Sequence, residues 1–241
     1  MLSFKKRILI LSLVVCLQNI LKSQTNSGAI SRTLTPEQVT ELFNEYPLTK
    51  QTIKFPIYKV YQFNDNTGVQ YAVLTEKPDS TNKTKEIINE KIQALCFKKE
   101  SNELKKIWEI NDFALKNTNN RVETSIWFWT KYCRFEDIDK DGKIEPVIVY
   151  GTSGGNGKSD GRIKIIINYK NIKYVIRHQN GELDFERRTE IDKAFYLLPK
   201  EIQKFVKGIM KSITSDNNAI FPYGWENAMN LNKTILQENQ N

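Results

Sequence analysis

Residues 162–178 read RIKIIINYKNIKYVIRH, in which two extended apolar runs are joined by Lys170-Asn171. Short runs rich in β-branched and aromatic residues, separated by a two-residue turn, are typical of a β-hairpin. Three further pairs of extended runs have the same form. They lie at residues 53–63 and 69–74, at 91–98 and 104–110, and at 125–135 and 146–150. The sequence therefore predicts a chain of four antiparallel hairpins.

Two helices are predicted on either side of the hairpins. Thr35 has the form of an N-cap, with Pro36 at the first helical position and Gln38 where a capping box closes. A second helix begins at Pro199 and carries an apolar stripe opposite a row of lysines. The stripe consists of Ile202, Phe205, Val206, Ile209 and Ile213. We expect this helix to cover the sheet, in preference to lying on an anionic membrane.

These elements predict a mainly β fold: an antiparallel meander of about eight strands, as an open barrel or a sandwich. A short N-terminal helix and an amphipathic C-terminal helix complete it. The single β-rich domain is expected to span residues 35–215. A polar, flexible leader at 24–34 precedes it, and a C-terminal tail at 216–241, rich in Asn and Gln, is expected to fray, with folding back of Phe221, Tyr223 and Trp225 as the alternative.

The N-terminus is typical of an export signal at residues 1–23. A basic head precedes an apolar run from Ile8 to Leu17, which suits the about 7–15 residues of a signal peptide and not the about 20 of a membrane span. After cleavage no transmembrane span is expected. Lipid anchoring through Cys16 is disfavoured, because Val15 is larger than the residue such processing needs. The expected location is the periplasm, the outer surface or the medium.

The charge balance disfavours nucleic acid as a partner. The formal net charge is +8, and loss of residues 1–23 would remove four basic residues and no acid, leaving +4. Lysines far outnumber arginines, although arginine is the side chain suited to bidentate recognition of phosphates and bases. An evenly spread lysine excess indicates a solvated surface, so we expect no nucleic-acid partner.

The strongest local signal is FEDIDKDGKIEPVIVY, residues 135–150. A D-x-D-x-D-G loop gathers oxygen atoms around one point, and calcium prefers six to eight oxygen ligands. The predicted ligands are the carboxylates of Asp137, Asp139, Asp141 and Glu145 and the backbone carbonyl of Lys143. Ile148 stands where a helix–loop–helix EF-hand needs glutamate, so a short calcium loop at a hairpin tip is predicted. The alternative is a metal-free turn in which the aspartates accept backbone N–H bonds.

Two further features are given structural interpretations. The loop GTSGGNGKSDGR at 151–162 lacks phosphate-loop spacing, because Thr152 stands where the first glycine is required, and a strand follows it. We expect a flexible loop that lines a binding surface beside the acidic turn. His178, the one histidine, ends a strand and has no accompanying serine motif. No catalytic residue is predicted.

The cysteines and tryptophans each leave two alternatives. A disulfide between Cys96 and Cys133 is permitted outside the cytoplasm, and burial as free thiols within apolar strands is equally consistent with the sequence. Trp127 and Trp129 share one face of an expected strand, where aromatic rows can stack on sugar rings. Core packing is favoured, because both faces of that strand are apolar.

Three segments resemble an exported bacterial family that is largely uncharacterised and loosely labelled as surface polysaccharide biosynthesis proteins. They are Trp108-x-Ile110-x-Asp112-Phe113, Phe135-x-Asp137-x-Asp139-x-Asp141-Gly142-x-x-Glu145, and Pro199-Lys200-Glu201 after the last hairpin. The resemblance covers roughly residues 50–213. It implies an envelope or secreted location, a β-rich fold with a terminal helix and a link to surface glycans. It implies no catalytic residue.

Three functional hypotheses follow from these features. The first is a non-catalytic, calcium-stabilised exported protein that binds or assembles a surface glycan or another exported protein. The second is a glycan-acting hydrolase whose carboxylates the sequence does not identify. The third is secretion-associated cargo, or a neutralising partner of another exported protein. One histidine and three cysteines exclude most zinc sites and any catalytic scheme that needs two imidazoles.

Overall fold

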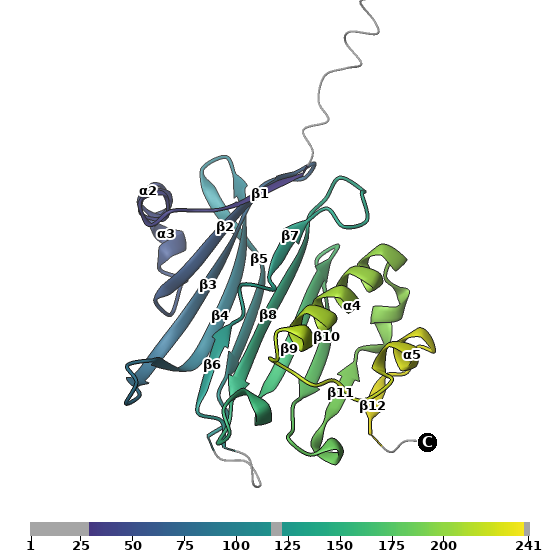
Figure 1. Cartoon of the computed structure of the whole chain (residues 1–241). Helices are drawn as coiled ribbons and strands as arrows, with labels where there is room; N and C mark the ends of the chain where they lie inside the picture. The colour runs from purple at the N-terminus through teal and green to yellow at the C-terminus, as the bar shows by residue number, and fades with distance from the viewer. Residues whose placement is uncertain (1–28, 117–121, 239–241) are drawn as a thin grey trace, which may run out of the picture.

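A computed structural model describes residues 29–116 and 122–238, which form two antiparallel sheets (Figure 1). The first sheet contains, in spatial order, β1 (Ile30–Thr33), β2 (Ile57–Asp65), β3 (Gly68–Thr81), β4 (Ile87–Glu100) and β5 (Glu103–Phe113). The second contains β12 (Ile235–Gln237), β11 (Arg188–Ile191), β10 (Ile172–Gln179), β9 (Arg162–Tyr169), β8 (Glu145–Ser153) and β6 (Ser125–Phe128), with β7 (Arg134–Glu136) also paired to β8. The predicted mainly β, sandwich-like fold is confirmed.

Each of the two sheets has helices packed next to it. α2 (Pro36–Glu45) and α3 (Pro47–Lys50) lie beside the five-stranded sheet, and α4 (Lys200–Ser215) crosses the seven-stranded one (Figure 1). The remaining helices are α5 (Trp225–Asn230) and the 3-10 turns η1 (Lys158–Asp160), η2 (Asp184–Glu186) and η3 (Lys193–Leu197). One large apolar core contains side chains of both sheets and of α4, and a smaller one lies under α2. None of the described helices is long and apolar enough to cross a membrane.

Three of the four predicted hairpins are confirmed as continuous strand pairs, and their turns have physical causes in the sequence. β9 and β10 pair directly across Lys170-Asn171, whose φ angles of 51° and 64° match the twist of a two-residue hairpin turn. β2 and β3 are joined by Asn66-Thr67, with Gly68 at φ 112°. The described residues form twelve strands, because several short strands that sequence periodicity does not reveal add to the about eight expected.

The start of α2 is confirmed in detail. Thr35 Oγ1 accepts a hydrogen bond from the Gln38 backbone N–H at 3.3 Å, and Gln38 Oε1 accepts one from the Thr35 N–H at 3.1 Å. These two bonds satisfy N–H groups that a helix start leaves without partners. The helix ends before Pro47, and its buried face, Leu42 and Phe43, packs on the five-stranded sheet.

This capping box gives a first testable prediction. Thr35→Ala removes the side-chain acceptor, so we expect the free energy of unfolding to fall by about 1 kcal/mol in urea denaturation. Thr40→Ala is the matched control, because Thr40 is exposed within the same helix and alanine has the higher helix propensity. An equal loss in both variants would contradict the capping role.

The C-terminal helix also agrees with the sequence interpretation. Ile202, Val206, Ile209 and Ile213 are buried in the large core, and Phe205 is partly buried against it. Lys204 and Lys211 on the opposite side are exposed. The apolar stripe therefore packs on the sheet, as expected.

The two chain ends differ from the expectations. Residues 30–33 of the expected flexible leader form β1, which pairs with β2, and the region expected to fray contains α5 and β12, which pairs with β11. Both strands are short and are held by backbone hydrogen bonds to a longer neighbour, which polar sequence alone does not reveal. The expected signal peptide at 1–23 and Cys16 lie outside the described residues.

The expected strand at 125–135 is broken in two. β6 and β7 both pair with β8, and residues 129–133 turn between them. The side chain of Trp129 packs over Gly151, where a Cβ atom would lie 2.6 Å from Trp129 Cζ2. Trp129 therefore lies outside β6 and is buried in the core, while Trp127 is half-buried and packs against the core, as favoured from the sequence.

Candidate metal site

The acidic loop connects β7 to β8 at residues 137–144 and makes a sharp turn. Gly142 has φ +86°, which glycine adopts without the steric cost of a side chain. A Cβ atom at this position would also lie 2.8 Å from Asn66 Nδ2. Glycine is thus required here both by the turn and by the close approach of the β2–β3 hairpin.

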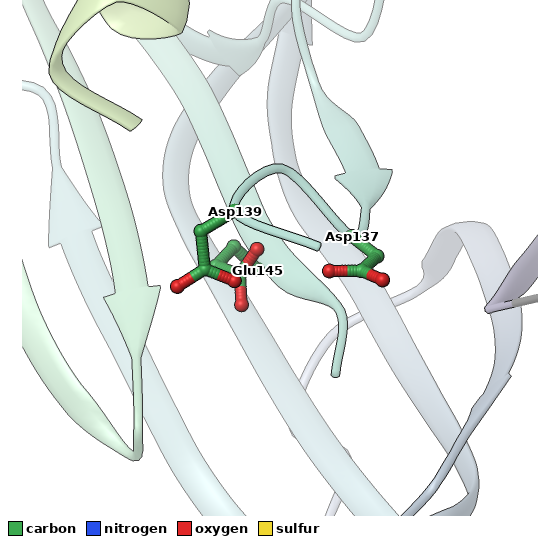
Figure 2. A group of neighbouring side chains, drawn as sticks. All are labelled: Asp137, Asp139 and Glu145. Atoms are coloured by element: carbon green, nitrogen blue, oxygen red, sulfur yellow. The ribbon is translucent and has the colours of Figure 1, made fainter. Parts of the chain in front are cut away.

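Three of the predicted ligands come together. Carboxylate oxygens of Asp137, Asp139 and Glu145 all lie within 4.8 Å of one another. Figure 2 shows Asp139 beside Glu145, with Asp137 pointing toward them. Asp141 is not part of this group; it is exposed, and its Oδ1 accepts the backbone N–H of Lys143 at 2.9 Å. The structure therefore provides a group of three acidic residues that could hold a metal ion.

Backbone N–H groups hold each of the three carboxylates in place. Asp139 Oδ1 accepts from Asp141 N at 3.2 Å, Asp137 Oδ2 from Gly142 N at 3.1 Å, and Glu145 Oε2 from Ile138 N at 2.8 Å. Each bond uses one oxygen of its carboxylate. Asp137 Oδ1 is buried without a hydrogen-bond partner in the described part of the chain. The backbone bonds of the metal-free alternative are therefore present, and they leave a buried acceptor unsatisfied.

Glu145 is the most perturbed of these acids. It is only 2% exposed, and burial, followed by the charges of Asp139, Asp141 and Asp137, raises its pKa to about 7. The bond from the Ile138 N–H opposes this shift. Within residues 29–116 and 122–238, neither Glu145 nor Asp137 nor Asp139 forms an ion pair. A cation at this position would relieve the repulsion among the three carboxylates.

The acidic loop is fixed to the other sheet by the tip of the β2–β3 hairpin. Asp65 Oδ2 accepts the Ile144 N–H at 3.0 Å, and the Asn66 N–H donates to the Gly142 carbonyl at 3.0 Å. Asp65 Oδ1 is occupied by the Thr67 N–H and hydroxyl. Local sequence spacing does not reveal Asp65, because it lies 79 residues from its partner Ile144. The loop thus connects the two sheets.

A cavity of about 340 Å³ adjoins this loop. Glu145, Lys143 and Asp65 contribute to its wall, together with Trp108 and Asn168. Asn168 is 7% exposed, and its Nδ2 has no acceptor in the described part of the chain. Glu145 therefore belongs both to the carboxylate group and to the wall of a polar cavity.

The other reactive side chains are buried and have structural roles. His178 is 2% exposed, with Nδ1 2.9 Å from Thr189 Oγ1, and burial lowers its pKa to about 4. Cys96 and Cys133 are buried free thiols, and burial raises the pKa of Cys133 to about 12. The structural interpretation of His178 and the free-thiol alternative for the cysteines are confirmed, and a thiolate is disfavoured at both cysteines.

The glycine-rich loop lies away from the acidic loop. It follows the C-terminal end of β8, whereas the acidic loop precedes the N-terminal end, so the full strand separates them. The two loops therefore do not adjoin each other, and the glycine-rich loop does not line the cavity beside the acidic loop. Gly154 and Gly157 bridge each other, and the short 3-10 turn η1 leads directly into β9.

Comparisons with family models, with curated proteins and with solved structures found no match to this chain.

Proposed function

We propose that this chain is a non-catalytic exported protein, acting in binding or assembly at the cell envelope, whose fold is stabilised by calcium in the acidic loop. The observation that carries this proposal is the convergence of Asp137, Asp139 and Glu145 around a buried, unsatisfied oxygen. Three carboxylates supply the hard oxygen ligands that calcium prefers, and Lys143 would add its backbone carbonyl. The export signal and the link to surface glycans remain part of the proposal.

The position of the loop supports a stabilising role. Its backbone is bonded to Asp65 and Asn66 of the five-stranded sheet, while Glu145 begins β8 of the other. A cation held here would reduce repulsion among carboxylates that the native fold forces together and the unfolded chain separates. Binding to the folded state alone raises the free energy of unfolding, by about 2.7 kcal/mol when the ligand is at 100 times its Kd.

The test is thermal melting of the purified protein with calcium, with magnesium and with a chelator. We expect calcium to raise the melting temperature by about 5–10 °C over the chelated protein, because about 1 kcal/mol shifts a chain of this size by about 2–4 °C. Magnesium should act more weakly, since it dehydrates reluctantly and demands near-octahedral geometry. An equal melting temperature in calcium and in chelator would contradict the proposed metal site.

Two variants test whether the calcium-dependent rise in melting temperature comes from the three-carboxylate group. Asp137→Asn with Asp139→Asn should abolish the calcium-dependent rise, because two of the three converging carboxylates lose their charge. Asp141→Asn is the matched control and should keep most of the rise, because Asp141 lies outside the group. Equal loss in both would contradict the three-carboxylate site. Release of reducing sugar from envelope polysaccharide by the purified protein would instead favour the hydrolase hypothesis.

A further inference from the structure

A second cavity, of about 630 Å³, lies where the two sheets meet, at the end of β8 opposite the acidic loop. Its wall combines Glu76 of β3, Asn89 of β4 and Trp127 of β6. The glycine-rich loop closes one side through Gly154, Gly155 and Gly157, and the β3–β4 turn contributes Asn82 and Glu86. Its volume is within the about 300–1,000 Å³ of small-molecule sites in proteins.

Two polar residues of this cavity, Glu76 and Asn89, are held in place by hydrogen bonds. Glu76 accepts the Phe128 N–H at 2.9 Å with Oε1 and the Asn89 amide at 2.9 Å with Oε2. Asn89 is 4% exposed, and its backbone N–H donates to Ser125 Oγ at 3.0 Å. Asn89 Oδ1 is buried and accepts no hydrogen bond in the described part of the chain. Such an orphaned acceptor is costly unless another donor reaches it.

Trp127 supplies the apolar surface. It is half-buried and packs beside Trp129, with ring centroids 6.1 Å apart. An indole that is partly exposed inside a polar cavity offers a flat apolar face for a ring-shaped ligand. Of Trp127 and Trp129, the two tryptophans whose sequence spacing allows sugar stacking, Trp127 lies on the cavity wall.

The charges of the wall disfavour an anionic ligand. Glu76 and Glu86 each place a carboxyl group on the cavity wall. Lys158 also lines the cavity, but its Nζ donates to Asn218 Oδ1 at 2.8 Å and lies 5.8 Å from the centre of the Trp129 ring. The ligand that fits is uncharged, carries several hydroxyl donors and has one flat C–H face. Pyranose sugars have this combination.

We propose that this cavity binds a neutral saccharide of one or two pyranose rings, with Trp127 stacking on the ring and Glu76 and Glu86 accepting its hydroxyls. The site shares no residue with the acidic loop, so it goes beyond the proposed calcium role and does not depend on it.

The test follows the four tryptophan indole N–H signals by NMR during titration with cellobiose, chitobiose, maltose and, as the anionic comparison, glucuronate. Titration to about 10 mM detects a Kd of about 1 mM. We expect at least one neutral disaccharide to shift the Trp127 signal, in calcium and in chelator alike. Trp108, on the other cavity, and Trp225, packed on Phe221, should stay unchanged and serve as internal references.

Variants connect the shift to the cavity. Trp127→Ala should weaken binding of the responding sugar by about tenfold or more. Glu86→Gln changes an exposed side chain and so preserves the fold, and should also weaken binding. Trp225→Phe is the control and should bind normally. The proposal is overturned if no neutral sugar shifts Trp127, if only glucuronate does, or if Trp127→Ala and Glu86→Gln both bind as the unmodified protein does.

Discussion

Arg162→Met is expected to lower the free energy of unfolding by about 3–5 kcal/mol, because it leaves a buried carboxylate without its cation. Arg162 on β9 pairs with Glu123 through Nε and, at 2.8 Å, through Nη2. Glu123 is 5% exposed. The same guanidinium donates to the Phe113 carbonyl at 3.0 Å, at the end of β5. Urea denaturation measures the loss.

The arginine acts together with a second ion pair between the sheets. Lys164 Nζ donates to Asp112 Oδ2 at 2.7 Å, and Arg162 Nη1 lies 3.7 Å from the same oxygen. Burial opposes ionisation of Asp112, but the hydrogen bond and charge of Lys164 prevail and lower its pKa. The basic side chains of β9 therefore offset the burial of Asp112.

The control for this prediction is a solvent-exposed ion pair on the protein surface. Arg188→Met breaks a pair with Glu190 of 2.8 Å, whose side chains are 42% and 48% exposed, and should cost less than about 1 kcal/mol. Combining Arg162→Met with Glu123→Gln should recover part of the loss, because no unpaired charge then stays buried. A loss in Arg162→Met no larger than in Arg188→Met would show that the network does not hold the sheets together.

Features coded by neighbouring residues were predictable from the sequence. The Thr35 capping box, the Lys170-Asn171 turn and the amphipathic stripe of α4 each depend on residues within a few positions or turns of one another. The convergence of Asp137, Asp139 and Glu145 follows from the same principle, since one short loop positions all three. Local spacing constrains local geometry strongly.

Features that depend on distant contacts were not predictable. The break at Trp129 arises because its ring needs the space over Gly151 of another strand. Asp65 anchors the acidic loop from the other sheet, and Asn89 meets Ser125 across 36 residues. Asp141, which spacing places among the ligands, lies outside the group of three; it is exposed and its carboxylate accepts the Lys143 N–H. Spacing predicts which residues are near, but hydrogen bonds decide which way they point.

Glu145 should make the stability of the calcium-free protein fall as the pH rises from about 4.5 to about 7. Its pKa is raised from 4.5 to about 7 in the folded state, so across this window the unfolded chain has released a proton that the folded chain still binds. The free energy of unfolding then decreases with pH, by up to about 3 kcal/mol in total at about 1.36 kcal/mol per unit of pKa shift. Below the window both states are protonated, and the full stability is retained. Denaturation with chelator at a series of pH values measures this fall.

Glu145→Gln should remove that fall, because glutamine has the same shape and no proton to lose. In the unmodified protein, calcium competes with the proton for Glu145. The calcium-induced rise in melting temperature should therefore grow from pH 5 to pH 8, opposite in sign to the fall in stability without calcium. The double variant Asp137→Asn with Asp139→Asn should lose the calcium response and also shift the fall toward lower pH, since neighbouring charges contribute to the raised pKa. A flat pH profile in chelator, identical in Glu145→Gln, would show that Glu145 is solvated in solution. The carboxylate group would then lack the buried charge that makes a cation stabilising.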